Sequence, residues 1–553
     1  MLEITTMKRK PKRKSGNKRN RTQATAKPTT IETVLQQGVS LFNAREFALA
    51  EQHYLNTIKL APDHAHSYFL LGSSRMMQGK VDGAVQAFTD AANRAPEEDT
   101  YFNSLALALE AQGKIDDAIK IFLKAIQLNP KSGPTHFNLG NTLFRQGNLP
   151  VAANCFANVV ALDPGMVDAI YNLGLVYRDM GQFSKAVETL KQAQALMPEK
   201  GVFEYSLASC FRMSGDQKQA LTHLEMAEVL EPDNAKFIYN QTFPLLALDR
   251  VQEGLDAYER RWEVRTKNAN LIPREFKQPL WDGTSDLSSK TILVWGEQGV
   301  GDILIWASAL HLVIARSARC IFECTPKMVS LLQRSFPEAE IIAEDISTDA
   351  TRTDIDTHIP LASLFHRLRP DLSEGLSPGA FITPNPERVA HWTEHLRELG
   401  PGPKVGISWA SPHNSRERAP NYTQLSEWEP ILKTPGVTFI NLQCFNYEDQ
   451  LAWAKDTLGV PIHNLEDIDL FDDIENIAAL AKSLDMVLSV ATGIAPIAAA
   501  VGTTVWQLTW RQSPWSNFLL SPRGPDVTYF YRDTLEPWDN AITAIAEQLA
   551  DFK

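Results

Sequence analysis

Residues Thr291–Leu310, TILVWGEQGVGDILIWASAL, mark the point at which the pattern of the chain changes. The first five residues are apolar and β-branched without a helical period, which predicts a buried strand. Three glycines, at 296, 299 and 301, then allow a tight turn, and apolar residues recur at helical spacing from Ile303 onward. A strand, a glycine turn and a helix start make a candidate anion site, because free amides and the helix dipole point at the turn. An ordinary strand–turn–helix of an α/β domain is the alternative, since the spacing is not that of a dinucleotide-binding turn.

Upstream of this stretch, residues 31–234 repeat with a period of 34. Each of six units ends in a proline, with an alanine twelve residues before it and a large apolar residue eight residues before it. Near the start of each unit stands a glycine or alanine. The four positions are occupied by Pro62, Pro96, Pro130, Pro164, Pro198 and Pro232; Ala50, Ala84, Ala118, Ala152, Ala186 and Ala220; Tyr54, Phe88, Phe122, Phe156, Leu190 and Leu224; and Gly38, Gly72, Ala106, Gly140, Gly174 and Ala208.

This spacing is what two closely crossing antiparallel helices need. Small residues allow close approach, a large residue fills the gap, and proline stops the second helix. The pattern resembles the tetratricopeptide repeat, which implies an α-solenoid: a superhelix in which each unit buries its apolar face against its neighbours. Residues Ala235–Arg265 form a seventh unit that keeps Tyr258, carries Gly254 at the small position and lacks the closing proline, as expected of a capping repeat.

The resemblance implies a concave groove that binds a peptide or protein. Asparagine recurs at or next to the sixth position of the unit, which faces the groove in such arrays, and its amide is able to bond an extended peptide backbone. Ordinary inner-helix asparagine is the alternative, because Ser206 and Leu70 interrupt the series. The groove candidates are Asn103, Asn138, Asn172 and Asn240.

Charge is spread unevenly along the 553 residues. The net charge is −12, yet residues 1–30 carry ten Lys/Arg and one acid, so this tail is +9 and the rest −21. Such a tail is expected to be disordered. Its charge suits nucleic acid, peripheral contact with an anionic membrane surface, or the acidic body of the protein, and a merely solvated tail is an equal alternative. The acidic body argues against nucleic acid as a specific partner.

The five cysteines form neither a disulfide framework nor a zinc pattern, which predicts a reducing, cytoplasmic location. No metal is implied, because Asp467-Ile468-Asp469 precedes a predicted helix and has no obvious ligand companions. No apolar run reaches the roughly 18 residues of a transmembrane helix, and the basic N-terminus lacks the apolar region of a secretory signal.

Beyond residue 265 the pattern predicts two α/β halves. Residues 266–290 form a linker that Phe276 and Trp281 are expected to pack down; the first half is 291–385, residues 386–403 are a connecting helix, and the second half is 404–553. Strands that alternate with helices predict parallel sheets, whose ligands lie beyond the carboxyl ends of the strands, here between the halves. The predicted strands are Thr291–Trp295, Cys320–Cys324, Glu340–Ala343, Thr357–Ile359, Lys404–Ala410, Val437–Leu442, Met486–Val490 and Thr504–Leu508.

Taken together, these residues resemble bacterial tetratricopeptide proteins whose C-terminal half is similar to the heptosyltransferase-like glycosyltransferases of family nine. The matching phrases are QPLWDG (278–283), ILVWGEQGVGD (292–302), VGISWA (405–410), LQ (442–443), LDMVLSVATGIAPIAAAVGTTVW (484–506) and PWSNFL (514–519). The resemblance implies a GT-B fold of twin Rossmann-type domains. It also implies inverting transfer of a sugar from a nucleotide diphosphate sugar to a protein or glycan acceptor, with no cofactor.

The resemblance also assigns roles to residues. Asp302, in the acceptor-side loop of Gly299 and Gly301, matches the catalytic base that takes the proton of the acceptor hydroxyl; helix capping is the alternative. Basic residues in the loop after VGISWA are implied to hold the diphosphate, here with His413 also available; solvated loop charges are the alternative. The nucleotide-sugar candidates are Arg416, Arg418, Thr492 and Gly493, the last two at the start of a helix that directly follows a strand.

The sequence departs from the family pattern S-V-D-T-x-x-A-H at two places. Ala491 stands where the family has aspartate, and Pro496 stands where it has histidine. Loss of both polar groups favours a second hypothesis: a non-catalytic interaction protein in which the repeats are a scaffold and the α/β half is degenerate.

Overall fold

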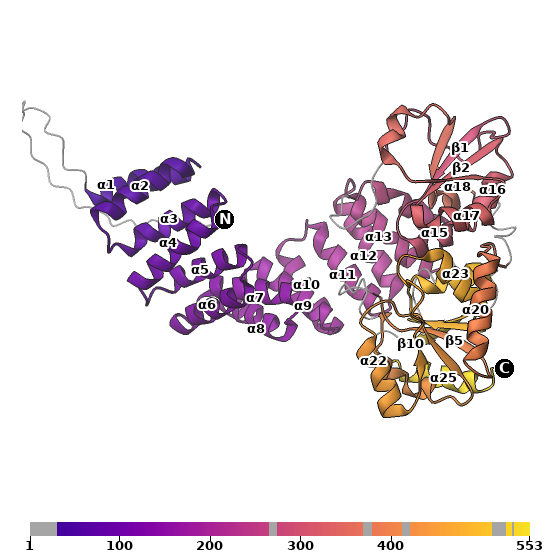
Figure 1. Ribbon diagram of the computed structural model, residues 1–553. Helices are drawn as coiled ribbons and strands as arrows, with labels where there is room; N and C mark the ends of the chain where they lie inside the picture. The colour runs from indigo at the N-terminus through magenta and orange to yellow at the C-terminus, as the bar shows by residue number, and fades with distance from the viewer. Residues whose placement is uncertain are drawn as a thin grey trace, which may run out of the picture. The chain divides into compact units, whose positions relative to one another are not determined.

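The computed structural model describes residues 30–264, 274–368, 379–411, 421–510, 527–532 and 536–552. The chain forms two compact units. The boundary between them lies between Leu162 and Asp163, where the helix α8 (Leu149–Leu162) of one repeat is followed by the helix α9 (Val167–Asp179) of the next (Figure 1).

From residue 30 onward, where its description begins, the first unit consists of four helix pairs. Their bounds are α1 Ile31–Asn43, α2 Phe47–Leu60, α3 Ala65–Met77, α4 Val81–Arg94, α5 Asp99–Ala111, α6 Ile115–Leu128, α7 Gly133–Gln146 and α8 Leu149–Leu162. Within a pair the predicted small and large residues meet: a Cβ built on Gly72 would lie 2.7 Å from the ring of Phe88. Ala84 has no exposed surface and Phe88 is 3% exposed. The predicted repeats are therefore confirmed: a small residue lets the two helices of a pair approach closely, and a large apolar residue fills the space between them.

A second 34-residue period lies in the turn between the two helices of each pair. The turn residue takes a positive φ in every repeat, five times as glycine and at both ends of the array as another residue. These residues are Arg45, Gly79, Gly113 and Gly147 in the first unit and Gly181, Gly215 and Asp249 in the second. Glycine suits this position because it adopts left-handed backbone without steric cost.

The second unit begins with three further helix pairs. Their bounds are α9 Val167–Asp179, α10 Phe183–Leu196, α11 Gly201–Met213, α12 Gln217–Leu230, α13 Ala235–Ala247 and α14 Val251–Tyr258. The last helix has only eight residues and continues as the 3₁₀ turn η1, Glu259–Trp262. The pair α13–α14 with η1 is called the capping repeat from here on.

A four-stranded parallel sheet follows, in the order β3-β2-β1-β4. The strands are β1 Thr291–Trp295, β2 Arg319–Cys324, β3 Glu340–Ala343 and β4 Thr357–Pro360. The helical segments are α15 Val300–Ala307, α16 Leu310–Ile314, η2 Pro326–Met328, α17 Val329–Ser335, η3 Ile346–Thr351 and α18 Ser363–Arg367. All connections cross over between parallel strands, as the alternation of strand and helix predicts.

In the described part of residues 404–532, a second parallel sheet has six strands in the order β10-β9-β8-β5-β6-β7. The strands are β5 Lys404–Ser408, β6 Thr438–Asn441, β7 Ile462–His463, β8 Met486–Ser489, β9 Thr504–Trp510 and β10 Val527–Arg532. The helical segments are α20 Pro386–Glu398, η5 Leu425–Trp428, α21 Glu429–Leu432, α22 Glu448–Trp453, the π-helical turn η6 Ala454–Leu458, α23 Ile474–Ser483, α24 Ile494–Val501 and α25 Asp539–Ala550.

Both sheets are doubly wound. From β7 to β10 the second sheet reads 3-2-1-4-5-6 in its own numbering, and the first sheet reads 3-2-1-4. The strand order reverses between β1 and β4 in one sheet and between β5 and β8 in the other. In such α/β sheets ligands bind outside the carboxyl ends of the strands at this reversal. The predicted α/β architecture is confirmed. A ligand site is expected at the carboxyl ends of the strands where the strand order reverses.

One hydrophobic core joins the parts of the second unit. It runs from Leu255 and Tyr258 of the capping repeat through α15 to α23, α24 and Val505 of β9. Trp306 of α15 stacks on Tyr258, with ring centroids 5.7 Å apart. Among the described residues, no helix combines the length and apolar character that crossing a bilayer requires.

Candidate functional site

A row of polar side chains crosses the six-stranded sheet near its carboxyl edge. Ser408 of β5 pairs in register with Ser489 of β8, Ser489 with Gln507 of β9, and Gln507 with Tyr529 of β10. In-register side chains of parallel strands share a face. This face is the one on which α24 packs, because Val487 and Val505, two residues earlier on their strands, belong to the same core as that helix.

The row contains buried polar atoms that lack partners. Ser408, Ser489 and Gln507 are all buried. Within the described ranges, neither the Gln507 side-chain oxygen nor the Tyr529 hydroxyl has a hydrogen-bond partner. A buried polar atom left unbonded costs about 1–3 kcal/mol, so a water molecule or a polar ligand group that bonded these two atoms would be favourable.

Gln443, which follows β6, organises the β5 end of the row. Its side-chain oxygen accepts hydrogen bonds from the Ser408 hydroxyl and from the amides of Trp409 and Ala410, all at 3.2 Å. The backbone amide of Gln443 donates to the side-chain oxygen of Asn441 at 2.9 Å. These bonds hold the chain where it leaves β5 and enters residues 412–420. Arg416, Arg418 and His413, predicted to bind the diphosphate, lie in that segment, outside the described residues.

Thr492 and Gly493 lie where the sequence places them, between β8 and α24. The Thr492 hydroxyl is 2.9 Å from the Ser489 hydroxyl, and the Thr492 amide donates to the Val490 carbonyl at 2.7 Å. Gly493 is the exposed N-cap of α24. The amides of a first helical turn have no partners within the helix, so this end of α24 offers donors to an anion.

Asp302 lies in the first turn of α15. Its carboxylate accepts from the amide of the N-cap residue Gly299 at 3.3 Å. Asp302 is thus not the N-cap itself, as the capping alternative supposed, but the third helical residue, whose carboxylate bonds back to the N-cap amide. A carboxylate has about four acceptor positions, so one capping bond does not exclude a second task.

The two predicted halves of the site touch each other through Gly301. A Cβ built on Gly301 would lie 3.6 Å from the Cα of Gly493 and 3.5 Å from the ring of Pro496. The start of α15 thus lies against the start of α24. Pro496, which replaces the family's histidine, stands in the first turn of α24, where its missing amide costs no helical bond. A Cβ at 301 would therefore meet only ordinary van der Waals contacts, so the approach of the two helices does not itself require a glycine.

The loop between β1 and α15 is bonded to the capping repeat. Glu297 forms a bidentate ion pair with Arg261 of η1, at 2.8 and 2.9 Å. Gln298 donates to the Tyr258 hydroxyl at 2.6 Å. None of these four residues was predicted to be functional. In the sequence, Arg261 is one of two adjacent arginines and carries no signal of burial.

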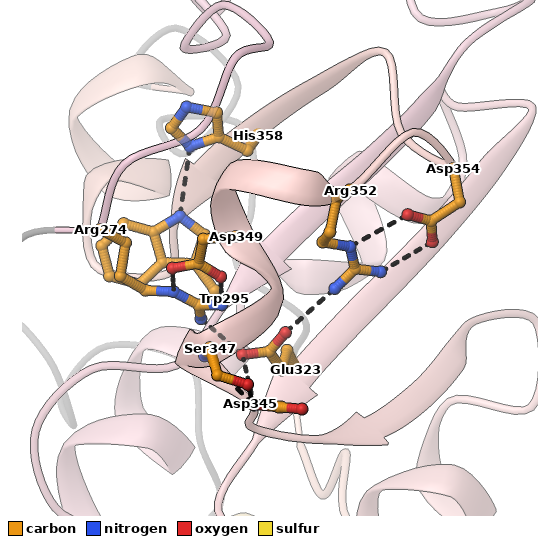
Figure 2. A network of polar contacts seen from close by, with 9 residues as sticks. All are labelled: Arg274, Trp295, Glu323, Asp345, Ser347, Asp349, Arg352, Asp354 and His358. Atoms are coloured by element: carbon orange, nitrogen blue, oxygen red, sulfur yellow. Dashed lines mark hydrogen bonds and ion pairs between the residues drawn. The ribbon is translucent and has the colours of Figure 1, made fainter.

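The linker is anchored by a separate ionic network (Figure 2). Arg274 bonds Glu323 at 2.5 Å and pairs with Asp349, and Arg352 bridges Glu323 at 3.1 Å and Asp354 at 2.8 Å. Arg274 also lies over the ring of Trp295, on the sheet face that carries Leu293 and Ile321 rather than the α15 face. The network therefore holds the linker on the face of the sheet opposite α15.

His358 shares this face and is neutral. Its Nδ1 accepts from the Trp295 indole at 3.3 Å, so that nitrogen carries no proton. Burial, together with the charge of Arg274, lowers the pKa of His358 to about 4. Within the described ranges, no group of three or more His, Cys, Asp or Glu is arranged to hold a metal ion.

The four predicted groove asparagines all lie on the first helix of their pairs. In the first unit Asn103 is buried and accepts from Asn138 of the next repeat at 3.0 Å. In the second unit Asn172 lies on α9, and Asn240 donates to the Lys236 carbonyl at 2.8 Å. Asn103 and Asn138 therefore have a structural task of their own, which is to join two repeats.

Comparison with known proteins supports the repeats directly. The tetratricopeptide repeat family model matches residues 35–99, 71–133, 137–198 and 171–235. Protein FlbA of Caulobacter vibrioides is 34% identical over 326 residues, which are 56% of this chain and 54% of that protein. The chain thus spans about half the length of this curated relative.

Solved structures are similar to part of the chain. MamA is 25% identical with a TM-score of 0.30 and covers 31% of this chain and 94% of its own. YrrB, a tetratricopeptide protein with an unusual peptide-binding site, is 15% identical with a TM-score of 0.32 and covers 34% and 97%. Cut9 bound to Hcn1 is 19% identical with a TM-score of 0.33 and covers 40% and 44%.

Proposed function

We propose that the α/β part is a GT-B glycosyltransferase of the inverting type, and that the repeats bind a protein partner. Residues 291–385 are then the acceptor half, and residues 404–553 are the nucleotide-sugar half. One observation carries the proposal: the starts of α15 and α24 lie against each other at Gly301 and Gly493, at the reversals of two doubly wound sheets. This is where a ligand that spans both halves is expected.

In this proposal Asp302 takes the proton of the acceptor hydroxyl as the hydroxyl oxygen attacks the anomeric carbon. The bond from that carbon to the diphosphate oxygen breaks, and the leaving diphosphate carries away the electron pair. A carboxylate within hydrogen-bond reach of the hydroxyl suits the first task. The capping bond from Gly299 holds the carboxylate in place at the start of α15.

The leaving diphosphate needs donors that are already oriented. The first-turn amides of α24 supply them beside Thr492 and Gly493, and the sequence adds Arg416 and Arg418 in the loop after β5. Since β5 and β8 are neighbours in the sheet, that loop starts next to Thr492. The unbonded atoms of Gln507 and Tyr529 support a polar ligand on this side, because a hydroxyl or amide group of the ligand would satisfy them.

The competing proposal is a non-catalytic scaffold. Ala491 and Pro496 favour it, since neither side chain offers a hydrogen bond and Pro496 packs against Gly301. Protein binding by the repeats is common to both proposals, as the matched repeats support. What separates them is the binding of a nucleotide.

Thermal unfolding with a panel of nucleotide diphosphates and nucleotide sugars tests the proposal. A nucleotide at a hundred times its Kd stabilises the folded protein by about 2.7 kcal/mol. Thr492→Val is expected to reduce this shift. If no nucleotide raises the melting temperature of the unmodified protein, the scaffold proposal replaces the transferase.

Where a donor binds, Asp302→Asn is expected to abolish sugar transfer and to leave the donor Kd within about twofold, because the base acts on the acceptor. Glu338→Gln removes an exposed carboxylate of the same half and is the matched control. Undiminished transfer by Asp302→Asn would remove this residue from the mechanism.

A further inference from the structure

The loop that precedes Asp302 is fixed from outside its own domain. Arg261, in η1 of the capping repeat, is 1% exposed, and Glu297 is 6% exposed. Their two parallel hydrogen bonds, Nε to Oε2 and Nη2 to Oε1, form the fork geometry that makes arginine–carboxylate pairs both strong and directional.

The remaining hydrogen-bonding groups of the pair are also used. Arg261 donates from Nη1 to Glu259 at 2.7 Å and from Nη2 to the Ser363 hydroxyl at 2.9 Å. Glu297 also accepts from the backbone amide of Ala362 at 3.1 Å. A buried ion pair is tolerated only when such additional bonds offset the loss of hydration. The pair thus ties the capping repeat to the loop after β1 and to the start of α18.

A second tie lies one residue further along the loop. Gln298 has a φ of 69°, in the left-handed region, which is strained for a residue with a side chain. Its amide is held by the hydroxyl of Tyr258, and the ring of Tyr258 stacks on Trp306 of α15. The strained residue is therefore secured by the same tyrosine that supports the helix carrying Asp302.

The capping repeat also lies close to Asp302 itself. Tyr239 of α13 packs against the core that contains Ile303 and Leu304. Burial raises the pKa of Tyr239; Arg261 opposes this shift, while the carboxylates of Asp302 and Glu297 add to it. A charge acts in this way on a hydroxyl only over a short distance.

We propose that the capping repeat is part of the site, with Glu297 and Gln298 as positioning residues through which Arg261 and Tyr258 fix the loop that presents Asp302. The catalytic significance of this arrangement rests on the proposed function. The positioning itself does not, and it is measured without any substrate. The α/β part is then inseparable from the last repeat, although the linker looks in the sequence like a place to divide them.

Amide hydrogen exchange on the full chain tests the positioning. Glu297→Gln keeps the shape of the side chain and removes its charge, and Tyr258→Phe keeps the stacked ring and removes the acceptor of Gln298. We expect the amides of residues 296–304 to exchange at least tenfold faster in the first variant and about threefold faster in the second. Amides of β2 and α7 should be unchanged. Arg250→Gln, which breaks an exposed ion pair at the start of α14, is the control and should leave the loop unchanged.

The proposal would be overturned if the amides of residues 296–304 exchanged in both variants at the same rate as in the wild-type protein. If Glu297→Gln raises exchange throughout the second unit, Tyr258→Phe decides: faster exchange confined to the loop supports positioning, and unchanged exchange refutes it. Where sugar transfer is detected, Glu297→Gln should lower kcat at least tenfold with an unchanged nucleotide Kd, whereas general damage would alter both. Failure of the wild-type protein to bind any nucleotide would remove the transferase, and the exchange result would still decide the positioning.

Discussion

Within a repeat, a small residue of the first helix meets a large apolar residue of the second. At the end of the array an arginine and a glutamate meet instead. Gly174 and Leu190 illustrate the first kind of contact, with 2.7 Å between a Cβ built on the glycine and the leucine side chain. Arg261 and Glu297 illustrate the second, with both side chains buried. The two kinds of contact differ in how much stability is lost when one of their residues is replaced.

An apolar contact loses stability in proportion to the atoms removed, and its neighbours relax into part of the space. A buried ion pair behaves otherwise, because removal of one partner leaves a charge without water or counter-charge. In the repeats, the stability lost on substitution should therefore grow with the number of apolar atoms removed. At the capping repeat, loss of either partner of the ion pair should remove most of the stability that the pair can contribute. Substitutions at Arg261 and at Leu190 test this contrast.

The largest effect is expected for Arg261→Met. Glu297 is left buried without its partner, so the unfolding free energy of the second unit should fall by about 4 kcal/mol in urea titration. Adding Glu297→Met should recover most of the loss, since two apolar side chains need no hydration. Arg250→Met removes an arginine that is 42% exposed and should change stability by less than about 0.5 kcal/mol. A loss below about 1 kcal/mol for Arg261→Met would mean that the pair is dispensable.

Leu190→Ala is expected to cost about 3 kcal/mol, because the leucine has no exposed surface and its removal leaves a cavity beside Gly174. Leu196→Ala on the same helix is the matched control: this leucine is 49% exposed, and its loss should cost less than about 0.5 kcal/mol. Urea titration of both variants gives the comparison. Equal losses would contradict the assignment of the buried face of α10.

Glu51 gives the first unit a pH dependence. Burial favours the neutral form, but hydrogen bonds from Lys80, Arg75 and Gln78 prevail and lower the pKa of Glu51 to about 2 from 4.5. The folded pKa is depressed, so this stability is complete above pH 4.5 and is lost as the pH falls toward 2. We expect roughly 1–2 kcal/mol, because the group remains partly in contact with solvent. Glu51→Gln should lower stability at pH 7 and flatten its decline in thermal unfolding between pH 6 and 3; an equally steep decline would exclude Glu51 as the cause.

The smallest effect is expected for Gly113→Ala. The residue has a φ of +84° and open space around it, so the added methyl meets only backbone strain, of about 1 kcal/mol. Arg45 stands at the same turn position with a φ of 64° and already has a side chain. Arg45→Ala should therefore be neutral within about 0.5 kcal/mol in thermal unfolding. A neutral Gly113→Ala would show that the periodic glycine is not required by its backbone.

The sequence predicted eight strands, and each has a counterpart at the predicted place with ends that differ by at most two residues. It missed β7 and β10. The first is only Ile462–His463, too short to show a period, and it exists because β6 lies beside it. The second, VTYFYR, carries a run of β-branched and aromatic residues that would have identified it.

At the candidate site, Asp302, Gly301, Thr492 and Gly493 followed from the glycine turn and from the resemblance. The structure adds that the two groups touch. The ion pair that holds the loop was not predicted. A charged residue is expected to be exposed to solvent unless it belongs to a motif that indicates a buried partner. Neither Arg261 nor Glu297 belongs to a motif that names its partner.

The sequence by itself determined the array: its 34-residue period, the small and large residues that meet in each pair, and the prolines that end the units. These contacts join residues close in the chain, so one local rule repeated six times is readable as a pattern. Only the tertiary structure decided which arginine is buried and what it holds. Arg261 reaches Glu297 36 positions away and Ser363 102 positions away, and these contacts exist only after the capping repeat and the first sheet have packed together.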